Sequence, residues 1–567
     1  MKQKNRISNC RFRRYLVMSV FLLAILGLLW RALDMQVMNQ AFFQQQGDAR
    51  HLRTVTVPAN RGDIYDRNGE PLAISTPVDS VWVNPAEFNA DAQNLQYMVD
   101  MLELDVKSLK QRISRSQLRE FLYIKRQIEP HLAEKVMALG LPGVYLQREY
   151  KRYYPAGEVT AHVLGFVNVD DQGQEGLELA YNDWLSGQEG AKQVIRDRLG
   201  RAIDDVERIS AAEPGKVVTA SLDKRVQYLA YRALKSAVKK HNAKAGSAVM
   251  LDVHTGEVLA MVNLPSFNTN NRNQLKPGVY RNRAVTDVFE PGSTMKPLTI
   301  AAAIESGRWH HKDHVRTSPG YMRVQGNLIK DPRDYGKLDL GGILLKSSNV
   351  GISKVALSLD QAQQLDMYMS LGLGASTSSG FPGESSGKIN ATNLGEFERA
   401  AMAFGYGVSV TPLQLARAYA ILANGGLVYP VSFLQLKEPS EGERVMSEKT
   451  ASQVRAMMEK VVTREGTGWR AQVPNYHVAG KTGTVHKSVV GGYAEDRYQS
   501  IFAGMAPASD PRLVMVVMLD EPSNGEYYGG QVAGPVFAKV MSGALRLLDI
   551  PPDNLKLAVK KAGRGQA

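Results

Sequence analysis

Pairs of a serine and a lysine three residues apart are the feature of this sequence with the clearest chemical potential. Positions i and i+3 share one face of a helix, so the lysine amine can approach the serine hydroxyl. A lysine whose pKa is lowered by burial and a second cation can be the base that a serine nucleophile needs. An isolated pair is more typical of a helix-capping serine beside a solvated lysine. The pattern occurs at Ser221/Lys224, Ser236/Lys239, Ser293/Lys296 and Ser385/Lys388.

Sequence context singles out Ser293 among these pairs. Only Ser293 directly follows Pro291-Gly292, and an apolar run at 297–306 comes after it. That run stops at Gly307, a residue suited to the end of a helix. Ser293 is therefore predicted to open a helix, whose first backbone amides are free donors with a dipole that favours a developing oxyanion.

Two further polar motifs change the interpretation of Ser293. Ser347-Ser348-Asn349 interrupts an apolar helical stretch, and Lys481-Thr482-Gly483-Thr484 contains the only Lys-Thr-Gly sequence, in a strand-like setting. Alone, the first would be a loop or helix cap, as Ser266-Phe267-Asn268 illustrates, and the second a strand with an exposed lysine. The Ser-x-Asn motif begins 54 residues after Ser293, and Lys-Thr-Gly begins 132 residues after Asn349. The prediction rests on the order of all three motifs.

The three motifs in this order resemble the active-site signature of penicillin-binding proteins and serine β-lactamases. The resemblance covers nearly the whole chain and is to the class B penicillin-binding proteins, in the second half to those of Gram-negative cell division. Segments similar to the N-terminal pedestal motifs of that class are RGDIYDRNGEPLA (61–73), RYYPAGEVTAHVLGFV (152–167) and GQEGLELAY (173–181). Later similar segments are FEPGSTMKP (289–297), KSSNVGISK (346–354), FGYGVSVTPLQLARAYA (404–420), GKTGT (480–484) and YYGGQVAGPVF (527–537).

This resemblance implies a peptidoglycan D,D-transpeptidase and assigns roles to five catalytic residues. Ser293 would attack the penultimate D-Ala carbonyl of a stem pentapeptide, with Lys296 as general base. Ser347 would relay the proton to the departing D-Ala, and Asn349 would hold a substrate amide. Lys481 would add positive potential. A second stem peptide's side-chain amine would then take the acyl group, and β-lactam antibiotics would acylate the same serine.

The third motif is expected to bind the substrate. The hydroxyl groups of Thr482 and Thr484 would hold the terminal carboxylate, and Gly483 would let the substrate backbone lie against the strand as an added strand. The backbone amides of Ser293 and Thr484 would form the oxyanion hole.

Other polar and aromatic residues are less informative. Tyr406, Tyr527 and Tyr528 lie in the similar segments, where walls of the substrate cleft and ordinary packing are equally good interpretations. His310, His311 and His314 form a histidine-rich turn without cysteine or a His-Glu-x-x-His pattern, which favours a solvated turn over a metal site. The reaction that the resemblance implies needs no metal or cofactor.

The N-terminal sequence predicts a membrane anchor. Tyr15 to Trp30 contains no charge, and Ala32 and Leu33 extend the apolar stretch past Arg31, so 15–33 is expected to span the membrane. A cleaved signal peptide is the alternative, but the following residues lack a small-x-small cleavage pattern. Six basic residues and no acid in 1–14 predict a cytoplasmic tail there and a periplasmic catalytic domain, with the protein in the bacterial inner membrane.

The distribution of charge and the cysteine content limit which functions and which kinds of fold are expected. The formal net charge is +13, but residues 1–14 contribute +6 and residues 556–567 contribute +4. The chain between carries only +3, which makes nucleic-acid binding an unfavourable interpretation. The only cysteine, Cys10, precedes the predicted span, so the exported part is expected to fold without disulfides.

The chain is predicted to be an α+β multidomain protein. A pedestal at 34–216, with a hairpin at Asn68-Gly69 and short helices within 91–140, precedes a transpeptidase domain at 217–553 and a basic flexible tail at 554–567. The second domain is expected to resemble serine β-lactamases, with an antiparallel β-sheet flanked by helices. Its strands are predicted at 217–223, 246–253, 257–263, 500–507 and 512–519, and its helices at 226–240, 535–548 and within 294–470.

Three alternatives to the transpeptidase remain at this point. A β-lactamase shares the serine and lysine but must activate water, and the chain has no Glu-x-x-Leu-Asn pattern. A D,D-carboxypeptidase would pass the same acyl group to water. A non-catalytic scaffold of the division machinery is the alternative from another class. The resemblance also implies a separate membrane glycan polymerase of the FtsW type and other division proteins as partners, and leaves open whether the protein is essential or a conditionally used paralogue.

Overall fold

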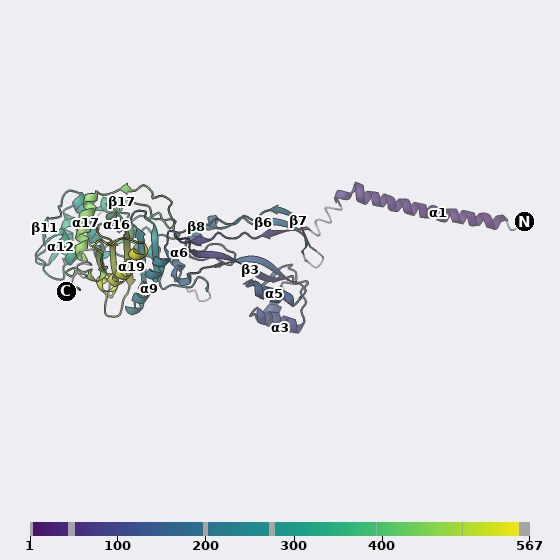
Figure 1. Ribbon diagram of the computed structural model, residues 1–567, viewed down its shortest axis with the longest axis horizontal. Coiled ribbons are helices and arrows are strands. Elements are labelled where there is room, and N and C mark those ends of the chain that lie inside the picture. The colour runs from purple at the N-terminus through teal and green to yellow at the C-terminus, as the bar shows by residue number, and fades with distance from the viewer. Residues whose placement is uncertain are drawn as a thin grey trace, which may run out of the picture. The chain divides into compact units, whose positions relative to one another are not determined.

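Two compact units make up the protein, whose computed structural model describes residues 4–42, 52–196, 202–271, 278–392, 394–489 and 492–554 (Figure 1). The first unit comprises residues 1–60, 77–150 and 187–214, and the second comprises residues 61–76, 151–186 and 215–567. The predicted basic tail at 554–567 lies outside the described residues except for Asn554.

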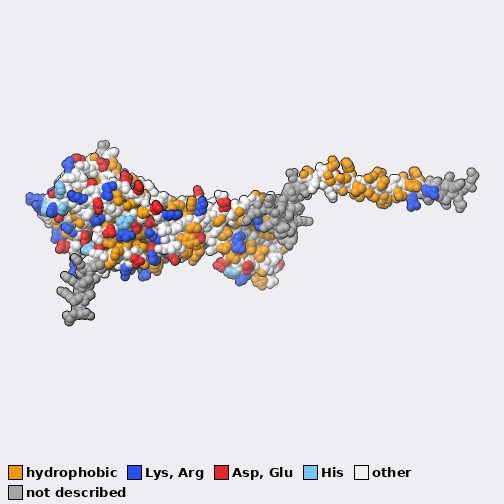
Figure 2. Space-filling view, turned by 45° about the horizontal axis from the view of Figure 1, so that its top comes forward, with side chains coloured by type: hydrophobic (Ala, Val, Ile, Leu, Met, Phe, Trp, Pro, Cys, Tyr) orange, Lys and Arg blue, Asp and Glu red, His pale blue; other side chains and the backbone are white. Residues whose placement is uncertain are grey.

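One long apolar helix begins the first unit. Helix α1 (Lys4–Leu33) continues into a π-helical turn at Asp34–Met38, and the stretch Arg11–Met38 is long and apolar enough to cross a membrane. Figure 2 shows hydrophobic side chains along this helix and basic ones near its N-terminal end. The predicted span at 15–33 lies inside this helix, whose exposed apolar surface suits hydrocarbon better than water.

The rest of the first unit contains a small helical subdomain and a three-stranded antiparallel sheet. The helices predicted within 91–140 are α3 (Ala92–Met101), α4 (Val106–Arg115) and α5 (Pro130–Ala138). Strand β4 (Leu122–Ile128) was not predicted, and it pairs with the end of β3 (Pro71–Val83). The three-stranded sheet has the order β1 (Leu52–Val57), β6 (Gly190–Arg196) and β7 (Ala202–Ser210).

The three N-terminal motifs meet in one buried group of charges within the second unit. Arg61 comes from the first motif, Arg152 from the second and Glu178 from the third. The carboxylate of the fully buried Glu178 accepts hydrogen bonds from Nε of Arg61 and Nε of Arg152, each at 2.7 Å. Two buried guanidinium groups thus share one carboxylate, an arrangement in which loss of one partner leaves an uncompensated charge.

We expect Glu178→Gln to destabilise the second unit by about 3–5 kcal/mol, because it removes the negative charge between two buried guanidinium groups. Urea unfolding of the detergent-solubilised protein measures the loss. Glu158→Gln is the matched control, because the Glu158 and Lys235 side chains that pair at 2.9 Å are 46% and 53% exposed. That control should lose less than about 1 kcal/mol. Equally small losses in both variants would contradict the structural role of Glu178.

A five-stranded antiparallel sheet forms the centre of the second unit. Its strand order is β10 (Val258–Leu264), β9 (Ala245–Asp252), β21 (Leu513–Asp520), β20 (Gly492–Ala506) and β19 (Ala479–Val489). Alternate residues of each strand face opposite sides. Met515 and Val517 pack in one core with helices α9 (Lys224–Lys240) and α19 (Gly534–Leu547), whereas Val514 and Val516 pack with α16 (Pro412–Ala423). The predicted antiparallel sheet flanked by helices is confirmed.

One predicted strand differs from the structure. Of residues 217–223, only Val218–Thr219 (β8) form a strand, and β8 pairs in parallel with β2 (Ile64–Tyr65) instead of joining the five-stranded sheet. The chain then turns into α9, whose N-terminus is capped by the buried Asp223 side chain. Because Asp223 starts a helix, the strand ends early.

Helices fill most of the region between β10 and β19, as predicted. They are α10 (Arg283–Thr286), the 3-10 turn η3 (Gly292–Met295), α11 (Lys296–Glu305), α12 (Leu340–Lys346), α13 (Asn349–Leu357), α14 (Gln361–Ser370), α15 (Glu396–Met402), α16 and α17 (Glu448–Val461). Between α11 and α12 lie short antiparallel pairs, including β12 (Tyr321–Val324) with β13 (Asn327–Lys330). The predicted boundary between pedestal and transpeptidase domain, after residue 216, remains a prediction.

Candidate active site

Ser293 lies at the start of a buried helix and next to the edge strand of the sheet. It belongs to the 3-10 turn η3, and the α-helix α11 begins at Lys296. The predicted helix start is therefore confirmed, with one tighter turn in front. Gly292 has φ +54°, and a Cβ there would lie 2.3 Å from Cγ2 of Val485 on β19. Glycine thus allows the turn that contains Ser293 to approach the strand.

Ser293 and Lys296 are joined through Ser347. Nζ of the fully buried Lys296 donates to the backbone oxygen of Ser347 at 2.6 Å, to Ser347 Oγ at 3.2 Å and to Oδ1 of Asn349 at 2.8 Å. Ser347 Oγ in turn donates to Ser293 Oγ at 3.0 Å. Within the described residues no hydrogen bond links Lys296 directly to Ser293. The hydroxyl of Ser347 therefore bridges Lys296 and Ser293.

Lys481 brings a second buried ammonium group to the same hydroxyl. It lies on β19, and its Nζ donates to Ser347 Oγ at 3.0 Å and to the backbone oxygen of Thr482 at 3.1 Å. Ser347 Oγ is therefore within 3.2 Å of Ser293 Oγ and of Nζ of both lysines. The structure brings together the serine, the lysines and the asparagine that the sequence selected.

The Ser-x-Asn motif forms a tight turn between α12 and α13. Ser347 has φ +56°, in the left-handed region, and the side chain of Ser348 caps α13. Asp331 accepts hydrogen bonds from Ser348 Oγ and from the backbone N–H of Asn349, both at 2.5 Å. These bonds hold a strained backbone conformation in place. Asp331 was not predicted from the sequence, because one aspartate 16 residues before the motif carries no distinguishing signal.

Burial lowers the pKa of both lysines. Removal from water and then the Lys481 ammonium lower the pKa of Lys296 well below its ordinary value, while Asp331 acts in the opposite direction. Burial lowers the pKa of Lys481 to about 7. Burial thus disfavours the charged form of both lysines, and a base at Lys296 requires its neutral form.

We expect the rate of acylation by benzylpenicillin to depend on the protonation of both lysines and to fall above about pH 7. The rate should rise as Lys296 loses its proton and can accept one, and fall above about pH 7 as Lys481 loses its charge. Second-order acylation rates between about pH 5 and 9 measure this profile. Lys481→Arg should remove the alkaline fall, because a guanidinium stays charged there. An alkaline limb at the same pH in that variant would contradict the assignment.

The threonines of the third motif lie on the edge strand β19. Thr484 Oγ1 accepts the backbone N–H of Gly529, the first residue of α18 (Gly529–Val532), at 2.9 Å. Thr482 Oγ1 lies 2.8 Å from Thr467 Oγ1. An edge strand has backbone groups that the sheet does not pair, so its position suits the predicted addition of substrate as a further strand.

Gly483 has a packing role that the sequence did not indicate. A Cβ at this position would lie 3.1 Å from the backbone oxygen of Pro291 and 3.2 Å from Cγ2 of Thr294. The absence of a side chain at Gly483 therefore lets β19 pack closely against the turn that contains Ser293. The predicted substrate contact of Gly483 remains a prediction. The oxyanion hole also remains a prediction. Ser293 is the second residue of η3, where backbone N–H groups have no hydrogen-bond partner inside the helix.

The predicted aromatic residues have different surroundings. The half-buried Tyr406 meets Tyr493 edge-on, with ring centres 5.5 Å apart. Tyr528 is 55% exposed and contacts Tyr527, which stacks on Tyr498 with centres 4.1 Å apart. The structure thus adds Tyr493 and Tyr498 to the aromatic residues found by sequence.

The histidine-rich turn shows no sign of a shared ligand. His310, His311 and His314 are exposed, and His310 pairs with Asp313 at 3.5 Å. Within the part of the chain that the structure describes, no group of three or more His, Cys, Asp or Glu side chains is arranged to hold a metal ion. The expectation of metal-free chemistry remains a prediction.

Comparison with known proteins gives the same assignment over both halves of the chain. Residues 246–542 match the penicillin-binding protein transpeptidase domain, and residues 56–220 match the penicillin-binding protein dimerisation domain. The chain is 42% identical to the probable peptidoglycan D,D-transpeptidase PbpC of Pseudomonas aeruginosa, over 96% of this chain and 97% of that protein. It is 41% identical to the peptidoglycan D,D-transpeptidase FtsI of Escherichia coli, over 98% of this chain and 95% of that protein.

Solved structures agree with the fold. The transpeptidase domain of Burkholderia pseudomallei penicillin-binding protein 3 is 42% identical and matches with a TM-score of 0.55, over 59% of this chain and 97% of that one. A peptidoglycan synthetase from Bifidobacterium adolescentis is 26% identical and matches with a TM-score of 0.70, over 88% of this chain and 98% of that one. The second match includes the N-terminal half as well as the catalytic fold.

Proposed function

Since the chain belongs to the class B penicillin-binding proteins, as a peptidoglycan D,D-transpeptidase that cross-links stem peptides, we propose that it does so through an acyl-enzyme on Ser293. The observation that supports this choice is the position of Ser347 Oγ, within 3.2 Å of Ser293 Oγ and of both lysine Nζ atoms. The Ser221 hydroxyl, by contrast, donates to the backbone oxygens of Val258 and Ser432.

Acylation begins with attack of Ser293 Oγ on the penultimate D-Ala carbonyl. The hydroxyl proton passes towards neutral Lys296, and the hydrogen-bonded path between these residues runs through Ser347. The bond to the terminal D-Ala nitrogen then breaks, and Ser347 delivers a proton to that nitrogen. Lys481 holds positive charge beside this path, which favours the developing negative charge and the substrate carboxylate.

Substrate binding is proposed to use the edge of β19. The terminal carboxylate lies by the hydroxyls of Thr482 and Thr484, and the acyl oxygen accepts from the backbone amides of Ser293 and Thr484. Asn349 has its Oδ1 committed to Lys296 Nζ at 2.8 Å, so its amide nitrogen is the group that can donate to a substrate carbonyl.

Acylation by benzylpenicillin tests this mechanism and separates it from the alternatives. We expect a burst of one antibiotic per protein, followed by slow release. Rapid turnover of the antibiotic would identify a β-lactamase. With a stem pentapeptide and an amine acceptor, cross-linked product is expected, and release of D-Ala with hydrolysed peptide alone would identify a carboxypeptidase.

The protein is a single-pass inner-membrane protein, and we propose that its catalytic unit is periplasmic. Arg11, Arg13 and Arg14 lie at the N-terminal end of the apolar stretch of α1, and basic residues of this kind are retained on the cytoplasmic side. Protease added to intact spheroplasts should digest the catalytic unit. Digestion only after lysis of the inner membrane would reverse the orientation.

A role in septal wall synthesis fits the relatives named FtsI, and we propose that a membrane polymerase of the FtsW type supplies the glycan strands. A polymerase of this type would lie in the same membrane as α1, whose apolar stretch is long enough to span it. Cross-linking from α1 to such a polymerase should give a specific adduct. Depletion that produces filaments would indicate the essential division enzyme, and normal division would indicate a conditional paralogue.

A scaffold role is separable from catalysis by complementation. If the protein acted only as a scaffold of the division machinery, a full-length Ser293→Ala variant would restore growth to cells that lack the gene. We expect no restoration, because acyl transfer at Ser293 is the proposed contribution. Equal membrane levels of variant and wild type are the control.

A further inference from the structure

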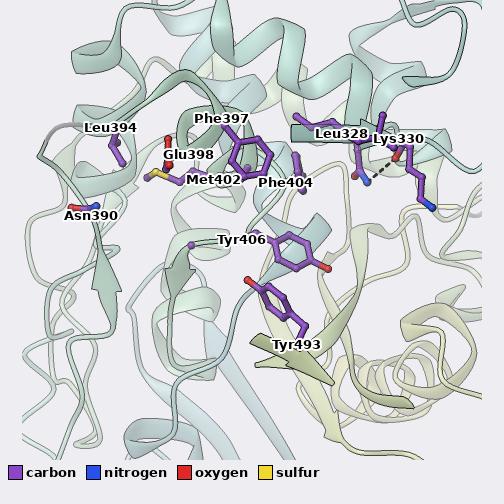
Figure 3. A pocket seen from close by; sticks show the side chains of 14 residues that line it. Leu328, Lys330, Asn390, Leu394, Phe397, Glu398, Met402, Phe404, Tyr406 and Tyr493 are labelled. Atoms are coloured by element: carbon purple, nitrogen blue, oxygen red, sulfur yellow. Dashed lines mark hydrogen bonds between the residues drawn. The ribbon is translucent and has the colours of Figure 1, made fainter. Parts of the chain in front are cut away.

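An apolar hollow opens beside the second motif, and Asn349 is the only one of its lining residues that the proposed mechanism uses. Its volume is about 490 Å³. Leu328 from β13, Leu394, and Phe397 and Met402 from α15 form part of its wall, together with Phe404 and Tyr406. Figure 3 shows Phe397 and Phe404 facing Tyr406 and Tyr493 across it. We call this cavity the α15 hollow.

Asn349 connects the α15 hollow to the reacting groups. It lines the hollow, and its Oδ1 accepts from Lys296 Nζ at 2.8 Å. Its amide nitrogen donates to the backbone oxygen of Lys330 at 3.3 Å, the bond drawn in Figure 3. One side chain therefore separates the hollow from the lysine that accepts and returns protons. A ligand in the hollow can reach the acyl group on Ser293 from the side of that lysine.

The residues that line the hollow would suit a ligand that has an alkyl chain and charged groups at its ends. The wall is mostly aromatic and aliphatic, which suits methylene groups. The exposed Lys330 and Glu398 lie at its margin and can bind a carboxylate and an ammonium group. Stem-peptide cross-linking requires such a second substrate, because the attacking amine stands at the end of an amino acid side chain and its peptide carries free carboxylates.

We infer that the α15 hollow binds the acceptor stem peptide, an inference that rests on the acyl transfer at Ser293 proposed above. The donor occupies the edge of β19 by its carboxylate, so the acceptor has to arrive from elsewhere. The alkyl side chain of the acceptor packs on Phe397 and Phe404, with a peptide carboxylate beside Lys330. Its amine leaves the hollow past Asn349, towards the acyl carbon.

The transfer step balances within this arrangement. The neutral amine nitrogen attacks the acyl carbon, an amide bond forms, and the ester bond to Ser293 Oγ breaks. One proton leaves the amine for neutral Lys296, and one proton returns to Ser293 Oγ through Ser347. The products are a cross-linked peptide and the free hydroxyl of Ser293. Water in place of the amine gives hydrolysis by the same path.

The partition of the acyl-enzyme between transfer and hydrolysis tests this inference. Full-length protein in detergent is acylated with a small D-alanyl thioester, and a synthetic stem tripeptide with a free side-chain amine is added. Leu328→Asp puts a carboxylate into the wall of the hollow, and we expect the ratio of transfer to hydrolysis to fall at least tenfold. Asn327→Asp adds the same charge one residue away, on an exposed residue outside the lining, and should leave the ratio within twofold.

Two further measurements make the result specific. Phe397→Leu removes a ring from the wall while retaining an apolar contact with the small core at Val324, Ile329, Val350 and Ala400, and it should also lower the ratio. Benzylpenicillin acylation, and transfer to free D-alanine, which is too short to fill the hollow, should match wild type in both variants.

The outcomes separate this inference from the proposed function. Failure of wild type to form an acyl-enzyme would overturn the chemistry at Ser293. Normal acylation with an unchanged ratio in Leu328→Asp and Phe397→Leu would overturn the acceptor site alone. A lower rate with a full-length peptide donor, at an unchanged ratio, would assign the hollow to the donor and would equally overturn the inference.

Discussion

Ser293→Ala should abolish covalent labelling by a fluorescent penicillin and lower the rate of cross-linking by a factor on the order of 10⁴ to 10⁶. Loss of a serine nucleophile lowers reaction rates by factors in this range. The variant removes the oxygen atom that is proposed to form the ester. Its folding should be nearly unchanged, because the Ser293 hydroxyl is partly exposed and makes one side-chain hydrogen bond, with Ser347.

Gel fluorescence after labelling and a thermal melt of the same sample provide both readouts. Ser385→Ala is the matched control, since Ser385 belongs to another Ser-x-x-Lys pair and is half-buried like Ser293. That variant should label at the rate of wild type. Labelling retained in Ser293→Ala would contradict the assignment of the nucleophile.

Lys296→Met should lower the acylation rate by about 10² to 10⁴, the usual contribution of a general base. Lys296 is fully buried, and burial together with the Lys481 ammonium disfavours its charged form. A neutral lysine in the folded state opposes a charged one in the unfolded state, which favours unfolding. Methionine has a similar length and removes this penalty.

The change of folding stability with pH is expected to differ between wild type and Lys296→Met. Between the lowered pKa of folded Lys296 and the ordinary pKa of about 10.4 in the unfolded chain, the unfolded state binds more protons. Stability of the wild type therefore rises with pH through this window, and Lys296→Met should show a weaker rise. Urea midpoints measured across the window test this. A steeper dependence in the variant would contradict a neutral Lys296.

Lys296→Arg is the control for positive charge without basicity. A guanidinium remains protonated throughout the window, so this variant should stay inactive as well. Recovery of acylation in Lys296→Arg would show that the positive charge of Lys296, and not its ability to accept a proton, is what the reaction needs.

The sequence predicted the parts of the site that short motifs determine. Ser293, Ser347 and Lys481 were each found by a local pattern, and the structure brings their side chains together around one hydroxyl. Local patterning also predicted β9, β10, β20 and β21, because continuous apolar runs between turn residues form buried strands. The hairpin at Asn68-Gly69 follows from turn chemistry and is present between β2 and β3.

What the sequence left open depends on contacts between distant segments. Asp331 is recognisable only once its carboxylate is seen holding Ser348 and Asn349, because aspartate in a turn is common. Glu178 accepts hydrogen bonds from both Arg61 and Arg152, and Arg61 lies more than 100 positions before it in the sequence. The packing reason for Gly483 appears only when the turn of Ser293 is placed against β19.

Intact-mass spectrometry and peptide mapping of the protein after reaction with benzylpenicillin test the central claim most directly. We predict a mass increase of one whole antibiotic per chain, located on the peptide that contains Ser293, and no adduct on that peptide in Ser293→Ala. An adduct on a peptide containing Ser221, Ser236 or Ser385, or rapid conversion of the antibiotic with no adduct, would contradict it.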